Sequence, residues 1–209
     1  MISHKIVGIY LAAGLSTRMG TDKLKLTLGS MNLGSIALTA ALHSDLDFVC
    51  VIANDNVPDW IDSTLYQEPF NRKWSVTLCH KALYGQAYSL RCGLAAAMAM
   101  KATAVMILLA DQPFISTKMI NELLQCYQTH RMKSNIHFVA SRYEHLARPP
   151  VVFDKQMYQE LLQLQDDQGA RHLIREGKSG ICIDFLSPNL FLDVDTAEDY
   201  RTLLDQMEF

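Results

Sequence analysis

The residues best suited to chemistry form one short run near the amino terminus, Leu11-Ala12-Ala13-Gly14-Leu15-Ser16-Thr17-Arg18-Met19-Gly20-Thr21-Asp22-Lys23. Its small residues let a ligand approach the backbone and accept hydrogen bonds from successive N–H groups. Arg18 and Lys23 add positive charge, Arg as a bidentate fork and Lys as a point charge. We therefore predict that a nucleoside triphosphate binds here. The predicted contacts are Leu11, Ala12, Ala13, Gly14, Arg18 and Lys23.

The spacing within this run excludes two common phosphate loops. Gly14 is followed by five residues before Gly20, so the run is not GxxxxGK[ST]. It is not GxGxxG either, which counts against a dinucleotide-binding fold. The alternative interpretation is an ordinary strand-to-helix turn that carries incidental surface charges.

Three acidic residues and one glycine stand at further informative positions. Asp111 emerges from an apolar run, where a carboxylate is costly unless it meets a cation or hydrogen-bond donors. Asp193 and Asp195 share a face if their segment is extended. Gly85 permits a tight turn into a helix whose first N–H groups can receive a ligand. The alternatives are that Asp111 caps the turn before Pro113 and that Asp195 caps the last helix.

Alternating strands and helices must position these residues, and this alternation predicts a mostly parallel sheet with helices on both faces. Strands are expected at 5–11, 47–53, 75–79, 104–110, 136–141 and 181–185, with an extended segment at 151–153. Helices are expected at roughly 31–43, 58–65, 86–100, 117–130, 155–164, 169–176 and 196–207. Ser116 or Thr117 can cap the fourth helix, and Thr196 with Asp199 has the spacing of a capping box. Ligands bind at the carboxyl ends of parallel strands, where the first loop lies.

Composition limits the classes of function. The 209 residues, 49% hydrophobic, predict a single domain over 1–209, with a nucleotide part at roughly 1–115 and an acceptor part at roughly 116–209. A net charge of -3 argues against nucleic acid and anionic membrane as general partners. No apolar run reaches the length of a membrane span. The cysteines are odd in number and lack a CxxC pair, so we expect reduced thiols in a cytoplasmic protein. They are Cys50, Cys79, Cys92, Cys126 and Cys182.

LAAGxSxRMGxxK at 11–23 resembles the signature of the MobA-like nucleotidyltransferases, which modify sugars, alcohols or molybdopterin with a nucleotide. Within that family the chain resembles molybdenum cofactor cytidylyltransferases and the purine-catabolism accessory proteins that serve xanthine dehydrogenase. Four further regions match in order, and three positions depart from the family pattern, namely Arg148 and Asp166 in place of Gly and Ala197 in place of Pro. The matching segments are 84–93 (G-x-x-x-S-L-R-x-G), 108–113, 148–153 with 166–171 (G-x-P-x-x-F and GDxGAR), and 193–199 (DxDTPxD).

The resemblance implies a three-layer, doubly wound α/β fold like that of nucleotide-diphospho-sugar transferases. It places Gly85 and Ser89 beside the base and ribose of the nucleotide. It implies that Mg²⁺ is held by Asp111 together with an acidic residue opposite, Asp195 as first choice and Asp193 as second. The acceptor residues that it implies are Arg171, Gly169 and Pro150, and the catalytic residues are Lys23, Arg18 and Asp111.

The implied reaction transfers CMP from CTP to the phosphate of molybdopterin and releases pyrophosphate. CTP is preferred to GTP because relatives that use GTP commonly carry LAGG where this chain has LAAG. A transient contact with a molybdenum hydroxylase such as xanthine dehydrogenase is expected. The alternatives are a sugar- or alditol-phosphate nucleotidyltransferase, a guanylyltransferase for the molybdenum cofactor, and a non-catalytic carrier of the finished cofactor.

Overall fold

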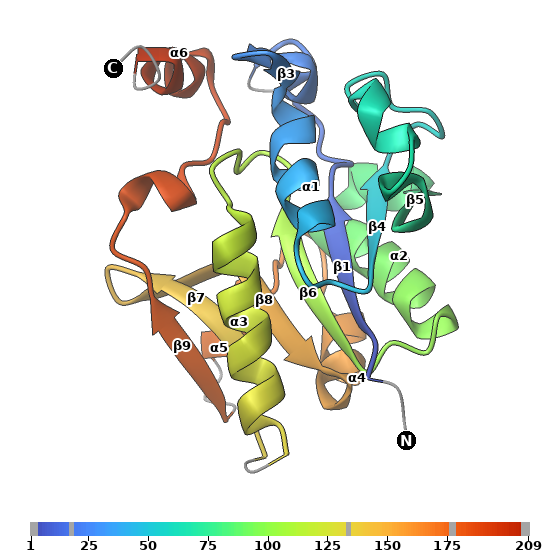
Figure 1. The fold of residues 1–209 in the computed structure, drawn as a ribbon, viewed down its shortest axis with the longest axis vertical. Helices are drawn as coiled ribbons and strands as arrows, with labels where there is room; N and C mark the ends of the chain where they lie inside the picture. Colours follow the sequence, from blue (N-terminus) through green and yellow to red (C-terminus); the bar gives the residue numbers. More distant parts are fainter. Residues whose placement is uncertain (1–3, 17–18, 133–134, 176–178, 206–209) are drawn as a thin grey trace.

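A seven-stranded sheet forms the centre of the molecule in this computed structural model, which describes residues 4–16, 19–132, 135–175 and 179–205 (Figure 1). The strand order is β5-β4-β1-β6-β8-β7-β9. β8 runs antiparallel to both of its neighbours, and every other pair is parallel. The strands are β1 (Ile6–Leu11), β4 (Phe48–Ala53), β5 (Trp74–Leu78), β6 (Ala104–Leu109), β7 (Phe138–Tyr143), β8 (Leu146–Asp154) and β9 (Gly180–Asp184), and β2 (Thr27–Leu28) pairs separately with β3 (Met31–Asn32).

Helices cover both faces of the sheet. In Figure 1, α1 and α3 lie in front of it and α2, α4 and α5 lie behind it. Two separate clusters of buried apolar side chains correspond to the two faces, one with Leu38 and Leu123, the other with Leu90 and Leu161. This confirms the predicted three-layer α/β fold. The helices are α1 (Leu33–His43), α2 (Gln86–Ala99), α3 (Thr117–His130), α4 (Tyr158–Gln163), α5 (Arg171–Arg175) and α6 (Ala197–Asp205).

The direction of winding reverses between β1 and β6. From β1 the chain moves outward to β4 and β5, then returns through α2 to β6 on the other side of β1. In open α/β sheets, such a reversal leaves a crevice at the carboxyl ends of the two strands, where ligands bind. The loop after β1 and Asp111 after β6 flank this crevice.

Most predicted helices and strands are confirmed with small differences at their ends, and the helix caps are confirmed. Ser116 Oγ accepts a hydrogen bond from the backbone N–H of Met119 at 3.2 Å. Thr196 and Asp199 cap α6 reciprocally, with distances of 2.7 and 3.2 Å. None of the helices within the described ranges is long and apolar enough to cross a membrane.

The helix predicted at 58–65 was wrong. This segment contains turns and the short 3₁₀ helix Ser63–Tyr66. Part of its backbone bonds to α1, because Ser35 Oγ donates to Trp60 O at 2.7 Å and accepts from the N–H of Asp62 at 2.8 Å. The buried Trp60 ring therefore fixes an irregular path that helix propensity does not predict.

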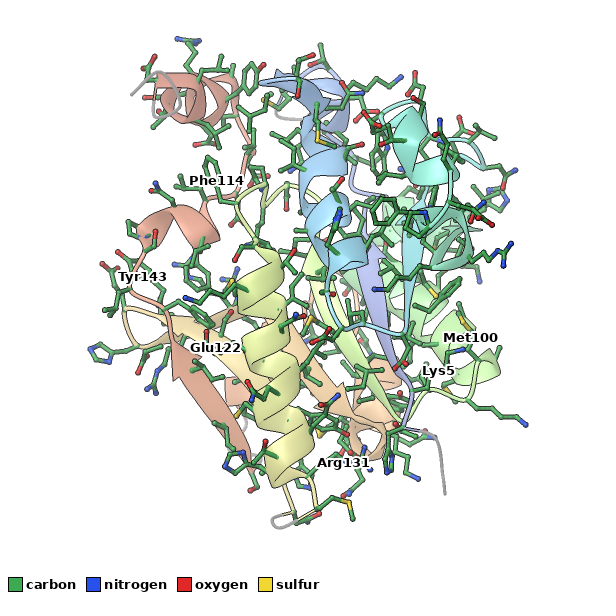
Figure 2. All side chains as sticks on the ribbon, viewed as in Figure 1. Lys5, Met100, Phe114, Glu122, Arg131 and Tyr143 are labelled. Atoms are coloured by element: carbon green, nitrogen blue, oxygen red, sulfur yellow. A yellow bond between two sulfur atoms is a disulfide. The ribbon has the colours of Figure 1, made fainter. Side chains whose placement is uncertain are left out.

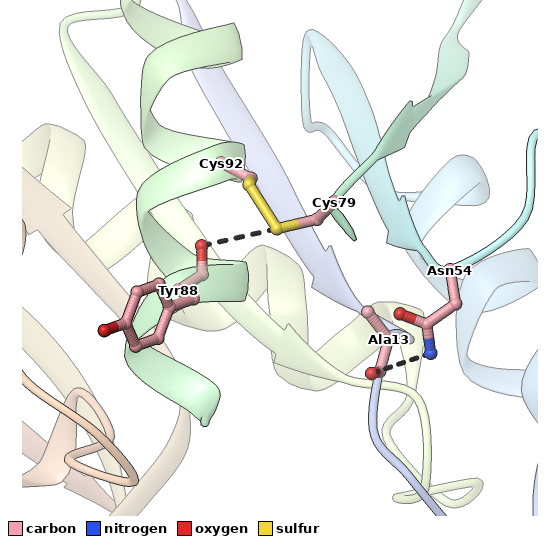
Figure 3. The surroundings of a disulfide bond; sticks show 5 residues. All are labelled: Ala13, Asn54, Cys79, Tyr88 and Cys92. Carbon is pink, nitrogen blue, oxygen red and sulfur yellow. Dashed lines mark hydrogen bonds between the residues drawn. A yellow bond between two sulfur atoms is a disulfide. The ribbon is translucent and has the colours of Figure 1, made fainter. Parts of the chain in front are cut away.

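The prediction that all five cysteines are reduced was also wrong. Cys79, directly after β5, forms a disulfide with Cys92 of α2, and their Cα atoms are 6.1 Å apart (Figure 3). Cys50, Cys126 and Cys182 are free. The pairing depends on how α2 packs across the end of β5, which a separation of 13 residues without a CxxC pattern did not reveal.

The far end of the sheet carries an aromatic cluster. Tyr143, labelled in Figure 2, stacks on Phe191 with ring centroids 5.6 Å apart. Phe185, which follows β9, meets the same ring edge-on at 6.5 Å. These contacts attach the segment before α6 to the β7–β8 hairpin, so that residues 193–195 are carried toward the crevice.

We predict that Gly93→Ala destabilises the fold by ~1–2 kcal/mol, because overpacking typically costs more than the gain in helix propensity. A Cβ at position 93 would lie 2.3 Å from Cγ2 of Ile9, a stiff side chain of the central strand. Urea unfolding measures the change. Met98→Ala, exposed on the same helix, is the control and should stay within about 0.5 kcal/mol of the original protein. Equal stability of the two variants would contradict this packing argument.

Candidate active site

One ion-pair network joins three distant segments at the crevice. Lys23 Nζ donates to Asp111 Oδ2 at 2.6 Å and to Asp195 Oδ1 at 2.8 Å. The lysine side chain is only 12% exposed. Burial alone would lower the pKa of Lys23, but the charges and hydrogen bonds of the two carboxylates outweigh burial and raise it. Lys23 is therefore a partly buried ammonium ion held between two carboxylates.

Ser16 organises the loop that presents Lys23. Its hydroxyl accepts the backbone N–H of Lys23 at 3.1 Å, and its carbonyl accepts the N–H groups of Met19 and Gly20 at 3.1 and 3.2 Å. The sequence interpretation did not assign a role to Ser16, although the S of LAAGxSxRMG was a signal for it. Arg18, predicted as a phosphate contact, lies outside the described residues.

The small residues at the start of the loop differ in what they offer a ligand. The N–H of Ala12 is already bonded to Ile52 O at 2.9 Å, so it continues the sheet. The carbonyl of Ala13 accepts from Asn54 Nδ2 at 3.0 Å, which ties the loop to the end of β4 (Figure 3). A Cβ at Gly14 would meet nothing within 4 Å, so open space lies beside it. Ala12 and Ala13 are buried and Gly14 is exposed, so the accessible part of the loop begins at Gly14.

Three cavities surround this loop. A cavity of about 210 Å³ is lined by Lys23, Asp111 and Asp195 together with Leu11 and Gly14. Another of about 670 Å³ extends from Asp111 toward α2, and one of about 470 Å³ lies on the β4 side of the loop beside Asn54. Asp111 lines both the first and the second cavity, so the ion pair stands at their junction.

The second cavity is lined by three of the predicted nucleotide contacts, Gly14, Gly85 and Ser89. Asp167, to which the sequence interpretation assigned no role, lines it as well. Asp167 comes from the segment that the sequence interpretation assigned to the acceptor alone. Its carboxylate therefore faces the same space as the predicted nucleotide contacts.

The acceptor segment packs directly on the start of α2. Asp166 O accepts the N–H of Ala87 at 3.0 Å, and a Cβ at Gly85, where φ is 126°, would lie 2.4 Å from that carbonyl. A Cβ at Gly169 would lie 2.5 Å from Gln86 Oε1. Two glycines thus allow the two halves of the cleft to touch, which spacing in the sequence did not show.

A small cavity of about 50 Å³ is lined by Gly169 and Arg171, two of the residues predicted to contact the acceptor. Pro149 lines it as well, whereas Pro150, the predicted residue, is not among the lining residues.

The two candidate acids before α6 have different surroundings. Asp195 reaches Lys23, whereas Asp193 Oδ1 accepts from Gln112 Nε2 at 2.6 Å. Burial, and then the charge of Asp111, raises the pKa of Asp193. Residues 192–195 form no strand, so the alternation used to place both acids on one face does not apply. Gln112 is fully buried, and its role was missed.

The carboxylates of Asp111 and Asp195 fit a divalent cation. They already share one cationic group, the ammonium of Lys23, at hydrogen-bonding distance. No three His, Cys, Asp or Glu side chains gather as a metal site in the described part of the chain. Mg²⁺ needs only one or two protein carboxylates when substrate phosphates and water complete its shell.

Comparison with known proteins identifies relatives over nearly the whole chain. Residues 8–180 match the model of the MobA-like NTP transferase domain. The chain is 34% identical over 204 residues to the purine catabolism protein PucB of Bacillus subtilis, covering 96% of each. It is similar to the crystal structure of Rv0371c from Mycobacterium tuberculosis, with a TM-score of 0.75, 25% identity and coverage of 97% and 98%. A manganese complex of Rv0371c aligns with a TM-score of 0.70, 24% identity and coverage of 96% and 98%.

The buried amide of Gln112 gives a stability prediction. Gln112→Met removes the donor to the buried Asp193 carboxylate and should cost ~1–3 kcal/mol of unfolding free energy. Gln112→Met combined with Asp193→Leu replaces both polar partners and should recover much of that loss. Urea unfolding tests both variants, with the exposed Gln125→Met on α3 as control. A double variant less stable than Gln112→Met would contradict this pairing.

Proposed function

Because the chain belongs to the family of MobA-like NTP transferases and is a nucleotidyltransferase, we propose that it transfers CMP from CTP to the phosphate of molybdopterin. The carrying observation is the Lys23 ammonium between Asp111 and Asp195, at the mouth of a cavity of about 670 Å³. This arrangement supplies a cation for phosphates and a carboxylate pair for a divalent ion, next to a space for a nucleoside.

The nucleotide lies along the loop after β1 in this proposal. Its base and ribose enter the large cavity beside Gly85 and Ser89, and its phosphates reach Lys23 and Arg18. Ser89 is 5% exposed and lines that cavity, which supports a polar contact there. Asp111 and Asp195 would hold Mg²⁺, which would offset phosphate charge when bound.

The acceptor attacks the α-phosphorus of CTP through its own phosphate oxygen, and pyrophosphate leaves. A phosphate monoester is already anionic at neutral pH, so this attack requires no general base. The residues of the chain contribute position and charge, the two effects that dominate phosphoryl-transfer catalysis. The packing of the 166–169 segment against α2 supports an acceptor held directly beside the nucleotide.

The purine-catabolism name of the Bacillus subtilis relative supports molybdopterin as acceptor and a molybdenum hydroxylase such as xanthine dehydrogenase as the recipient of the product. The manganese complex of Rv0371c supports a divalent ion in the site. The LAAG sequence at 11–14 supports CTP over GTP.

We expect pyrophosphate release only with CTP, molybdopterin and Mg²⁺ together, and loss of turnover in Asp111→Asn. The assay measures pyrophosphate with each of CTP, GTP, ATP and UTP, with and without molybdopterin, and circular dichroism controls for folding. Pyrophosphate release that depends on a sugar phosphate or an alditol phosphate would show that this compound, and not molybdopterin, is the acceptor. Tight cofactor binding by Asp111→Asn, without turnover by the original protein, would favour a carrier.

We expect Arg171→Ala to raise the KM for the acceptor by about tenfold or more, since a charge-assisted contact to phosphate is worth ~1.5–3 kcal/mol. The affinity for CTP, measured by calorimetry, should stay unchanged. Arg142→Ala is the matched control, because Arg142 pairs with Asp184 at the far edge of the sheet. Weakened CTP binding by the Arg171→Ala variant would show that Arg171 contacts the nucleotide and not the acceptor.

A further inference from the structure

Within the described part of the chain, two carboxylates at the site share the ammonium of Lys23. Asp111 and Asp195 each accept a hydrogen bond from Lys23 Nζ, at 2.6 and 2.8 Å. These distances put the ammonium between the two acids. The charge of the three groups sums to one negative unit, so the pair would gain from a cation of higher charge.

The ammonium and a divalent ion compete for the same place. A metal ion bound by the two carboxylate oxygens that contact Lys23 would need the place that Lys23 Nζ occupies. Lysine is a compact point charge on a flexible stem, so it can leave while its backbone stays fixed. The backbone is fixed here, because Ser16 Oγ holds the N–H of Lys23 at 3.1 Å.

We propose that Lys23 serves as an internal substitute for the divalent cation, occupying the carboxylate pair in the empty protein and moving to the phosphates when a metal-bound nucleotide enters. This inference rests on the proposed function for the nucleotide but not for the acceptor. The exchange keeps each carboxylate paired in both states, and it avoids the large penalty of leaving a buried charge without a partner.

The exchange makes metal and nucleotide binding cooperative. Free metal must displace the ammonium and leave it without a partner, so the empty protein binds metal weakly. A nucleotide offers the displaced ammonium a new anionic partner, so metal binds more tightly in its presence. By linkage, metal strengthens nucleotide binding by the same factor.

The test measures Mn²⁺ binding to the protein without nucleotide, from the electron paramagnetic resonance signal of free Mn²⁺. Lys23→Met removes the competitor and should bind Mn²⁺ at least about tenfold more tightly than the original protein, equivalent to ~1.4 kcal/mol. Lys23→Arg keeps a cation between the acids and should bind weakly, like the original. Lys23→Met with Asp111→Asn should lose the gain, which assigns it to this site.

Lys25→Met is the matched control for a lost positive charge nearby. Lys25 follows two residues later and pairs with the exposed Asp59 at 2.7 Å, so Mn²⁺ affinity should not change. Circular dichroism confirms folding of each variant, and Lys23→Gln replaces Lys23→Met if the latter does not fold. Equal or weaker Mn²⁺ binding by the Lys23→Met or Lys23→Gln variant would overturn the proposal.

A second measurement separates this inference from the proposed function. CTP should tighten Mn²⁺ binding to the original protein by at least about tenfold, whereas the gain should be much smaller in Lys23→Met. If the original protein binds no nucleotide with Mn²⁺, the proposed function fails, although tighter metal binding by Lys23→Met can still be observed. If nucleotide binds and its effect on Mn²⁺ is equal in both proteins, the exchange fails and the function stands.

Discussion

The site depends on the ion pairs that the partly buried ammonium of Lys23 makes with Asp111 and Asp195. This ammonium connects the loop after β1, which carries Lys23, to the end of β6 and to the segment before α6. Asp111 and Asp195 in these two segments are 88 and 172 residues away from Lys23 along the chain. Two neighbouring carboxylates repel each other, and a cation placed between them offsets this repulsion. The local structure of all three segments brings the ammonium and the two carboxylates together.

The sheet explains why these segments meet. Winding outward from β1 to β5 and returning to β6 opens the crevice at the point where the loop and Asp111 emerge. The carbonyl of Asp111 also accepts the N–H of Val194 at 3.0 Å, so the backbone positions Asp195 through its neighbour. The aromatic contacts of Tyr143 and Phe191 hold the preceding segment against the sheet. The acids are therefore placed by backbone and packing before any ligand arrives.

Much of this arrangement could be predicted from the sequence, because strand and helix periodicity is local and the loop signature is unusual. The same motifs placed Lys23 and the acids in one site. They did not predict that Lys23 contacts the acids directly. Contacts set by packing could not be predicted. The Cys79–Cys92 disulfide, the buried amide of Gln112 and the approach of Asp166 to Gly85 each depend on how separate elements are stacked. The irregular path around Trp60 depends on one hydroxyl, that of Ser35.

Charge also explains why the nucleotide should arrive with its own cation. Among the described residues that line the cavity at the ion pair, Lys23 is the only cation, and it is already shared by two acids. Lys25, which lines the cavity on the β4 side of the loop, is paired with Asp59. Beside Asp111 and Asp195 a bare triphosphate would therefore meet two carboxylates for one ammonium, and these carboxylates would oppose its approach. A metal-bound triphosphate instead brings the charge that the acids lack and accepts the lysine that they release. The same acids that would repel the free anion thus select its metal complex.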